Sequence, residues 1–301
     1  MTDAADRRML LVHAHPDDET IASGVTMAKY AAEDVQVTLV TCTLGEEGEI
    51  LVPDLLHLGA QEQDMLGHHR ITELTDAMKI LGIDDFLMLG EPHKYRDSGM
   101  AGLPTNKRQN SFWQADLLEA TADLVPVIRT QRPQVVITYD EFGAYGHPDH
   151  IQAHRVAMYG VMLAAAPSFR PELGRAWDVP KVYWTATPRS KLKEAIEALR
   201  ASGDTSEMAQ IDPDNNPFSV DDELVTTAID GRKYISNKVA AMHAYPTQIS
   251  AERGFFSFAA LNDSAMGVEY FRLVKGQLGP VAADGDAAGY ETDLFAGITP
   301  S

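Results

Sequence analysis

The stretch MLLVHAHPDDETIASGVTMAKYAAEDVQVTLVT, residues 9–41, decides the fold expected of this chain. Its two ends, 9–14 and 35–41, are apolar runs of the kind that form buried β-strands. Between them, apolar side chains recur at helical spacing at Ile21, Val25, Ala28 and Ala32. A strand, a helix and a second strand in this order predict a βαβ unit, and therefore a parallel sheet.

The same alternation continues through the first half of the chain. A second amphipathic helix, with apolar residues between 71 and 81, precedes the strand-like run DFLMLG (85–90). The apolar run QVVITYD (134–140) predicts another buried strand, followed by a helix from residue 150. The fold class is therefore predicted to be α/β, with a doubly wound, mostly parallel, Rossmann-like sheet in residues 1–170.

After about residue 170 the pattern is looser. Strands are expected at 181–186 (KVYWTA) and 270–274, helices at 191–199 and 232–243, and a polar loop at 211–217. We interpret residues 171–301 as a mixed α/β C-terminal part that packs on the first region within one continuous domain.

Composition narrows the classes of function. The 301 residues are 45% hydrophobic, which is enough for a sizeable core, and the formal net charge of -19 argues against nucleic acid and membrane surfaces as partners. The single cysteine, Cys42, excludes an intramolecular disulfide and is interpreted as a packing residue. The longest apolar run, 156–166, is far shorter than the ~20 residues of a membrane span. A cytoplasmic protein acting on a small molecule is expected.

Two clusters of histidine and aspartate follow predicted strands. Asp17 and Asp18 stand side by side behind His13 and His15, and YGHPDHIQAH (145–154) follows QVVITYD in the same way. Ligands of parallel sheets bind beyond the carboxyl ends of the strands, so both clusters can reach one crevice. Adjacent carboxylates repel each other, which a shared cation would relieve.

This pattern favours a catalytic metal site. Asp18, His15 and one histidine of the second cluster would form a two-histidine, one-carboxylate set with positions left for water, whereas structural zinc sites are closed by four protein ligands. Asp17 would then take a proton from a water molecule made acidic by the metal. The residues leave alternatives open: the histidines could be core residues, and the aspartates could cap the helix. Spacing alone does not choose between His150 and His154, which share a helix face.

The motifs AHPDDE and GHPDH resemble those of the LmbE-like or PIG-L family of zinc-dependent N-deacetylases. The segments TCTLGEEGEI, HHRITEL, YRDSGMAG and YETDLFAG are similar to the members that remove acetyl from N-acetylglucosaminyl-inositol in mycothiol biosynthesis. The resemblance runs from about residue 9 to residue 297. It implies hydrolytic deacetylation of this small amino-sugar inositol.

The resemblance also implies roles for individual residues. The metal, which is zinc or, as an alternative in the cell, iron, would be held by His15, Asp18 and His150, with Asp17 as general base. The oxyanion and the leaving amine would be served by three further residues of the second cluster: Tyr145 polarising the carbonyl, His147 acting as a charged or proton-donating group, and Asp149 tuning His147. Two residues, Arg70 and Asp97, would hold hydroxyls of the sugar or inositol, and a surface ion pair is their alternative.

The residues leave three other interpretations open. A mycothiol S-conjugate amidase of the same family tends to carry a lysine shortly after its HPDDE, where this chain has Ile21 and Ala22. A magnesium-dependent phosphate- or sugar-binding protein could use the same sheet. However, no glycine-rich phosphate loop follows the first strand, and two histidine ligands suit zinc or iron better than magnesium. A purely structural metal is the third possibility.

Overall fold

A single sheet organises the computed structural model, which describes residues 6–205, 207–250 and 266–298. The sheet has seven strands in the order β3-β2-β1-β4-β5-β7-β6. Neighbouring strands from β3 to β5 are parallel, and β7 is antiparallel to both β5 and β6. The predicted α/β class with a mostly parallel sheet is confirmed. The strands are β1 (Arg8–His13), β2 (Gln36–Thr41), β3 (Asp85–Met88), β4 (Val135–Thr138), β5 (Lys181–Ala186), β6 (Thr227–Asp230) and β7 (Val268–Lys275).

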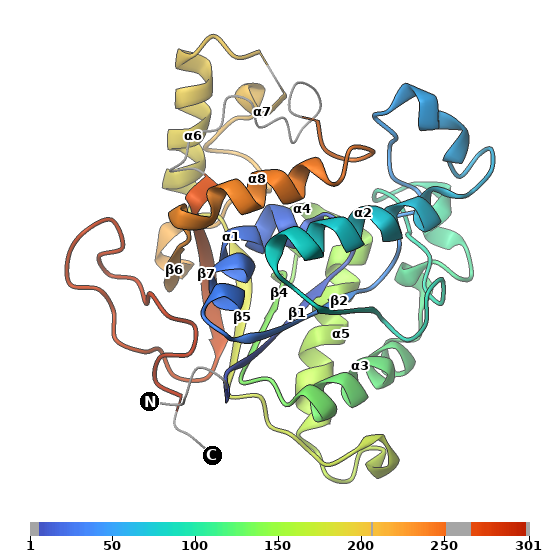
Figure 1. Ribbon diagram of the computed structural model, residues 1–301, viewed down its shortest axis with the longest axis horizontal. Coiled ribbons are helices and arrows are strands. Elements are labelled where there is room, and N and C mark those ends of the chain that lie inside the picture. The colour runs from blue at the N-terminus through green and yellow to red at the C-terminus, as the bar shows by residue number, and fades with distance from the viewer. Residues whose placement is uncertain (1–5, 206, 251–265, 299–301) are drawn as a thin grey trace.

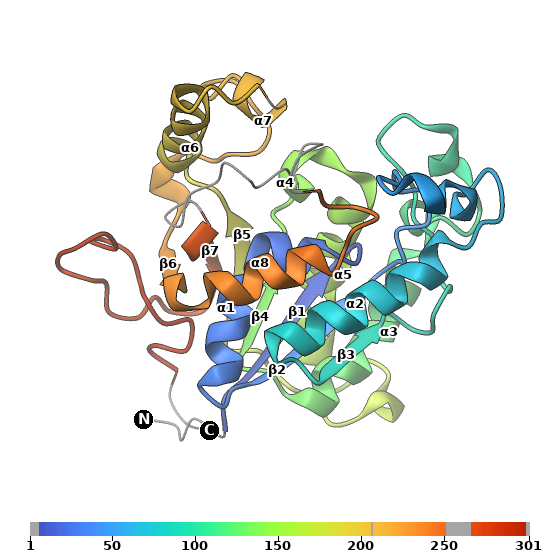
Figure 2. The ribbon, with the colours of Figure 1, turned by 45° about the horizontal axis from the view of Figure 1, so that its top comes forward.

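Helices cover both faces of the sheet (Figure 1, Figure 2). One face is covered by α1 (Asp18–Ala32), α2 (Leu66–Leu81) and α8 (Ile235–His243), and the other by α3 (Leu117–Gln131) and α5 (Pro148–Ala164). Shorter or outlying helices are α4 (Gly143–Gly146), α6 (Arg189–Ala201) and α7 (Glu207–Gln210). Single turns of 3-10 helix lie at Pro53–Leu58, Pro104–Lys107, Phe112–Gln114, Pro171–Leu173, Asp222–Leu224 and Arg232–Tyr234.

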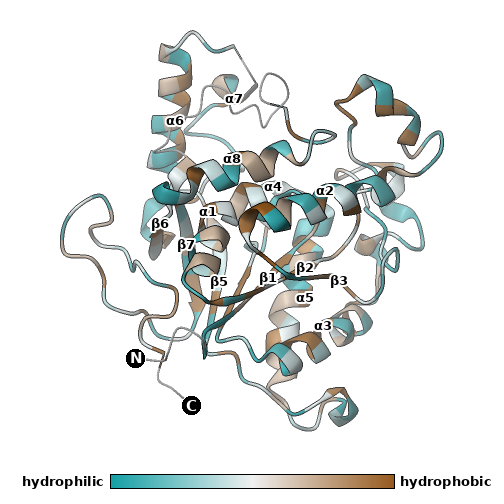
Figure 3. Cartoon of the chain, viewed as in Figure 1, coloured by the Kyte–Doolittle hydropathy of each residue, from teal (hydrophilic) through white to brown (hydrophobic). Residues whose placement is uncertain are grey.

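Alternation along β1 joins the two layers of the core. Met9 and Leu11 pack with α1 and α2, whereas Leu10 and Val12 pack with α3 and α5. Successive side chains of a strand point to opposite faces, so a strand covered on both sides must be apolar throughout. Figure 3 shows the consequence, with hydrophobic colouring on the central strands and hydrophilic colouring over much of α6.

The helices depart from the sequence prediction in three places. Helix α5 begins at Pro148 rather than 150, because proline is well suited to the first helical position and His147 serves as N-cap. Helix α3 was missed. It is capped by the Asp116 carboxylate, but Pro126 stands in its interior and obscured its helical pattern. The predicted helix 232–243 is a 3-10 turn followed by α8.

Chain direction places the candidate site. After β1 the chain moves outward to β2 and β3, then returns to the other side of β1 with β4. The segments that leave β1 and β4 at their carboxyl ends therefore begin side by side, which is where ligands of such sheets bind. Among the described residues, no helix is both long enough and apolar enough to cross a membrane.

Candidate metal centre

The carboxylate of Asp18 lies between two histidines from different strand ends. Its Oδ2 atom is 3.2 Å from Nδ1 of His15 and 3.4 Å from Nε2 of His150. Bonds of about 2.0–2.2 Å in a tetrahedral zinc site place donor atoms roughly 3.3–3.6 Å apart. The structure thus brings both histidines predicted as ligands to the carboxylate of Asp18, the third predicted ligand.

The surroundings of the His150 ring are those expected of a metal ligand. It is 2% exposed, and neither ring nitrogen has a hydrogen-bond partner among the described residues. Buried polar atoms are normally satisfied, so an ion at this position would account for the unpaired nitrogen that faces Asp18. His154, the alternative in the sequence, is engaged elsewhere, with its Nδ1 atom 2.9 Å from the carbonyl oxygen of Tyr139.

Asp18 is itself held in place. Its Oδ2 atom accepts hydrogen bonds from the backbone N–H of His15 and from the hydroxyl of Tyr139, each at 2.8 Å. Burial raises the pKa of Asp18, but the adjacent His150 and His15 more than offset this and hold the pKa well below its usual range. The group is therefore a carboxylate, as a metal ligand must be.

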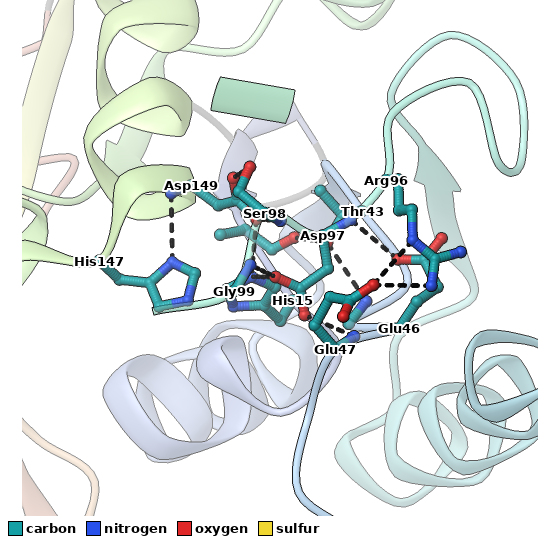
Figure 4. A network of polar contacts seen from close by, with 12 residues as sticks. His15, Thr43, Glu46, Glu47, Arg96, Asp97, Ser98, Gly99, His147 and Asp149 are labelled. Carbon is teal, nitrogen blue, oxygen red and sulfur yellow. Dashed lines mark hydrogen bonds and ion pairs between the residues drawn. The ribbon is translucent and has the colours of Figure 1, made fainter. Parts of the chain in front are cut away.

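His15 is oriented from behind by a second carboxylate. Its Nε2 atom is 3.2 Å from Oδ2 of Asp149 (Figure 4). The backbone N–H of Ser98 donates to the same oxygen, and the Ser98 hydroxyl donates to Oδ1. A proton on Nε2 leaves a lone pair on Nδ1, the atom that faces Asp18. Carboxylates commonly fix metal-binding histidines in this way.

The contact of Asp149 differs from the one expected. Asp149 was predicted to tune His147, but its carboxylate contacts His15, and only its backbone N–H reaches Nδ1 of His147, at 3.1 Å. The reason is local: His147 is the N-cap of α5, and an N-cap side chain bonds a backbone N–H of the first helical turn.

His147 lies beside the centre in a neutral form. Burial, with smaller contributions from His15 and His150, lowers its pKa to about 3. Because Nδ1 accepts from a backbone amide, the proton lies on Nε2. His15, His147 and His150 also form a group whose ligand atoms lie within 4.8 Å of one another, so His147 is close enough to contact anything bound there.

Asp17 points away from Asp18, toward an arginine. Its Oδ2 atom is 2.9 Å from Nη2 of Arg70. Burial raises the pKa of Asp17 to about 8 against the lowering effect of Arg70, and the charge of Asp18 adds to the rise. The adjacent aspartates thus have separate partners, Arg70 for Asp17 and the two histidines for Asp18.

Arg70 and Asp97 lie next to the centre but are occupied inside the protein. The Arg70 guanidinium also donates to the carbonyl oxygens of Pro16 and Gly45. A side chain at position 45 would meet that guanidinium, since a Cβ there would be 1.8 Å from Nη1, and Gly45 has φ +65°. Asp97 accepts from the backbone N–H of Glu47 and of Gly99. Their predicted contact with substrate hydroxyls remains a prediction.

A cavity of about 490 Å³ lies at the centre. Asp18, His150 and Tyr145 are part of its lining, together with residues of α1, β5, α6, α7, α8 and β7 and of the segment 217–220. Its volume is in the range of small-molecule sites, about 300–1,000 Å³. Tyr145, predicted to face the substrate carbonyl, lies with its ring 5.0 Å from that of His150 and so faces this space.

Three supporting residues were not found from the sequence. Tyr139 holds Asp18, Ser98 holds Asp149, and Glu19 accepts from the backbone of Asp17. Each stands inside a segment that had been singled out, namely QVVITYD, YRDSGMAG and AHPDDE. Their position in those segments was a usable signal, but the direction of each side chain depends on the tertiary structure.

The chain with this geometry is similar to known proteins. The model of the PIG-L family, described as GlcNAc-PI de-N-acetylase, matches residues 10–160. A 1D-myo-inositol 2-acetamido-2-deoxy-alpha-D-glucopyranoside deacetylase of Geodermatophilus obscurus is 56% identical over 294 residues, which cover 97% of this chain and 98% of that protein. The chain belongs to the PIG-L family. The resemblance inferred from its motifs is confirmed.

Solved structures agree on the fold. The N,N'-diacetylchitobiose deacetylase of Pyrococcus horikoshii superposes with a TM-score of 0.61 at 17% identity, over 92% of this chain and 87% of that one. A 4-carboxy-2-hydroxymuconate hydratase of Pseudomonas putida superposes with a TM-score of 0.56 at 17% identity, over 92% and 100%. Since proteins of different named activity share the fold, the reaction must be argued from the site and the close relatives.

Proposed function

We propose that this PIG-L protein hydrolyses the acetamide of 1D-myo-inositol 2-acetamido-2-deoxy-alpha-D-glucopyranoside, releasing acetate and the free amine of mycothiol biosynthesis. The observation that carries the proposal is identity of 50–56% with relatives named for that reaction, such as those of Geodermatophilus obscurus and Streptomyces avermitilis. The matched regions extend over nearly the whole of each chain.

We assign the metal to His15, Asp18 and His150. The contacts of Asp18 with both histidines, and the ring nitrogens of His150 that have no hydrogen-bond partner among the described residues, support this set. Two histidines and a carboxylate suit zinc, and also ferrous iron. A divalent metal held there supplies the positive charge that makes a water molecule acidic and polarises an amide carbonyl.

The protein's own groups account for the proton transfers. Asp17 accepts a proton from the attacking water as the water oxygen bonds to the carbonyl carbon. His147, with its proton on Nε2, donates a hydrogen bond to the reacting amide, and Tyr145 donates its hydroxyl to the carbonyl oxygen as negative charge develops. When the C–N bond breaks, a proton passes to the amine, and acetate leaves.

The order of the first five strands, with the chain reversing at β1, supports a doubly wound, Rossmann-like arrangement. Contacts of Arg70 and Asp97 with substrate hydroxyls are proposed as well, and Nε of Arg70 has no hydrogen-bond partner among the described residues. Action in the cytoplasm on a small molecule remains a prediction.

The test uses purified protein stripped of metal and reloaded with zinc or ferrous iron. It is offered N-acetylglucosaminyl-inositol, plain N-acetylglucosamine and a mycothiol S-conjugate, and the released amine is measured. We expect the highest kcat/KM for N-acetylglucosaminyl-inositol and little turnover without metal. Preference for the S-conjugate would identify an amidase instead. Release of no amine from any substrate, with either metal, would overturn the proposal.

A further inference from the structure

The backbone of Asp17 adopts a conformation that side-chain-bearing residues rarely take. Its φ is +123° and its ψ is -36°, outside both helical and extended regions. Asp17 is the N-cap of α1, but its side chain makes no capping hydrogen bond. Strained backbone of this kind persists only where the surroundings impose it, and it is common at functional sites. The contacts that impose it here are therefore of interest.

Glu19 holds the backbone of Asp17. The N–H of Asp17 donates to Oε2 of Glu19 at 3.1 Å. A glutamate in the first turn of a helix often returns to the N-cap amide in this way. The other oxygen, Oε1, accepts from the hydroxyls of Thr20 and Tyr245, each at 2.6 Å. Glu19 and Tyr245 are both fully buried.

The chemistry of these contacts makes Glu19 more than a packing residue. Its three described partners are all donors, so both oxygens act as acceptors. Burying a carboxyl group among hydroxyls and an amide costs free energy that an apolar side chain of similar size would avoid. A fully buried carboxyl group directly behind a strained residue therefore indicates a positional requirement.

Asp17 is held from the other side as well. Arg70 of α2 donates to the Asp17 carboxylate and to the carbonyl oxygen of Pro16. Glu19 thus fixes the backbone while Arg70 fixes the side chain. Asp18, the next residue, turns to His15 and His150. The positive φ at Asp17 separates two neighbouring carboxylates that would otherwise compete for one position.

We propose that Glu19, held by Tyr245, is a positioning residue that fixes the backbone of Asp17 and thereby sets where the Asp17 carboxylate lies at the metal centre. The inference rests on the proposed function, in which Asp17 is the general base. It also gives the segment after α8 a role at the site, since Tyr245 follows that helix directly.

Two substitutions at Glu19 separate hydrogen bonding from shape. In Glu19→Gln, the amide oxygen can keep the bond to the Asp17 N–H, because the hydroxyls of Thr20 and Tyr245 can rotate to accept from the amide NH₂ group. In Glu19→Met, all three bonds are lost at similar volume. Tyr245→Phe removes one of the hydrogen bonds to Glu19 and is therefore milder than Glu19→Met. Its matched control is Tyr183→Phe in β5. The hydroxyl of the buried Tyr183 also donates to a glutamate, at 2.6 Å from Oε2 of Glu291.

The experiment measures kcat, KM, zinc content and thermal stability of the zinc-loaded variants. A base displaced by about 1 Å can cost about 100-fold in rate, so we expect Glu19→Met to lose roughly that factor in kcat with KM and zinc content nearly unchanged. Glu19→Gln should keep kcat within about 10-fold, and Tyr245→Phe should fall between the two. Tyr183→Phe should lower thermal stability but not kcat. Equal kcat for Tyr245→Phe and Tyr183→Phe would overturn the proposal.

Crystal structures of the parent enzyme and of Glu19→Met provide a readout that does not depend on activity. We expect Asp17 to relax to a negative φ in the variant and its carboxylate to leave the position beside Arg70. An unchanged positive φ together with full kcat would contradict the positioning role. If the parent enzyme releases no acetate, the proposed function fails, yet the φ of Asp17 in the variant still decides whether Glu19 fixes this backbone.

Discussion

Asp17 and Asp18 diverge because the chain between β1 and α1 turns through a positive φ at Asp17. One carboxylate meets Arg70, and the other meets His15 and His150. Identical side chains therefore have different surroundings, which is the usual way in which a site assigns different chemistry to two carboxyl groups. We propose that Asp18 binds the metal and that Asp17 accepts the proton.

Asp149 acts through His15 in this account. Asp149→Asn should weaken zinc binding by about 10- to 100-fold, because the amide no longer supplies the carboxylate that orients and polarises the His15 ring. Zinc dissociation constants measured against a chromogenic chelator would show this. Asp123→Asn, which alters a carboxylate bonded to Lys94 and Tyr95 away from the centre, should leave the constant unchanged. Unaltered zinc affinity in Asp149→Asn would contradict the assignment.

Ionisation of Glu46 makes the stability of the fold depend on pH. Burial raises the pKa of Glu46 above its ordinary value of 4.5, although hydrogen bonds, among them the one from the Asp97 N–H, oppose the rise. The folded protein then holds a proton that the unfolded chain has released, so this group stabilises the fold at acidic pH and loses that contribution as pH rises through the folded pKa.

Glu46→Gln should therefore gain stability relative to the parent protein as pH increases from 4 to 7. Denaturant unfolding of the metal-free proteins across this range measures the difference. The amide oxygen of glutamine can still accept from the Asp97 N–H, so the comparison isolates ionisation. A difference that shrinks with rising pH would show that the sign is wrong.

At the scale of elements, α5 connects the site to a distant anchor. Its N-terminus carries His147 and His150, and its C-terminal carbonyls at Leu163 and Ala164 accept from the guanidinium of Arg129 on α3. The same guanidinium also bonds carbonyls of the following loop, at Ala166, Phe169, Arg170 and Gly174. One buried arginine thus caps the helix that presents two of the centre's histidines.

Arg129→Met should destabilise the protein by at least about 3 kcal/mol, since several buried carbonyls lose a charged donor. Arg129→Lys should lie between, because a single ammonium reaches fewer of them. Chemical denaturation followed by circular dichroism checks both values. A loss below about 1 kcal/mol in Arg129→Met would mean that water replaces the guanidinium without difficulty.

The sequence predicted those elements whose pattern is set by the sheet. β1, β2 and β4 are short apolar runs that are mostly buried on both faces, and α1 and α2 have clear periodicity. Helix α3 was hidden by its internal Pro126, and β6 is only four residues long, so its pairing with β7 depends on partners distant in the chain. Local pattern does not encode such pairing.

For the site, the sequence predicted which residues gather but not how each side chain is bonded. The convergence of His15, Asp18 and His150 follows from two motifs placed after adjacent parallel strands. The choice of His150 over His154 came from resemblance, and the geometry supports it. The inward direction of Arg70 and the turn of Asp149 toward His15 depend on tertiary contacts that spacing does not reveal.

At the scale of the whole molecule, a buried carboxylate joins the C-terminal segment to the sheet. Glu291 is fully buried and bonds Nζ of Lys181 at 2.5 Å, the hydroxyls of Tyr183 and Thr227, and the N–H of Gly279. Thus the YETDLFAG segment contacts β5 and β6. Because β5 also pairs with β4, and the Tyr30 hydroxyl of α1 donates to Asp293 of the same segment, we propose that residues 1–170 and 171–301 unfold as one domain.

Lys181→Met should cost about 3–5 kcal/mol, because it leaves the Glu291 carboxylate buried without its cation. If the molecule is one cooperative unit, β1 and β6 of the variant should lose their protection from hydrogen exchange at one shared denaturant concentration, which is lower than the concentration shared by β1 and β6 of the parent. Opening of β6 at clearly lower denaturant than β1 would show two units instead.

The two adjacent aspartates are proposed to have different roles, proton transfer for Asp17 and metal binding for Asp18. Zinc content and turnover of Asp17→Asn and Asp18→Asn, measured side by side with added zinc, test this proposal most directly. Asp17→Asn should retain zinc and lose about 10²- to 10⁴-fold in kcat, and added zinc should not restore it. Asp18→Asn should lose zinc and regain part of its activity in excess zinc. An Asp17→Asn enzyme that turns over at the parent rate, or that excess zinc rescues, would contradict the account.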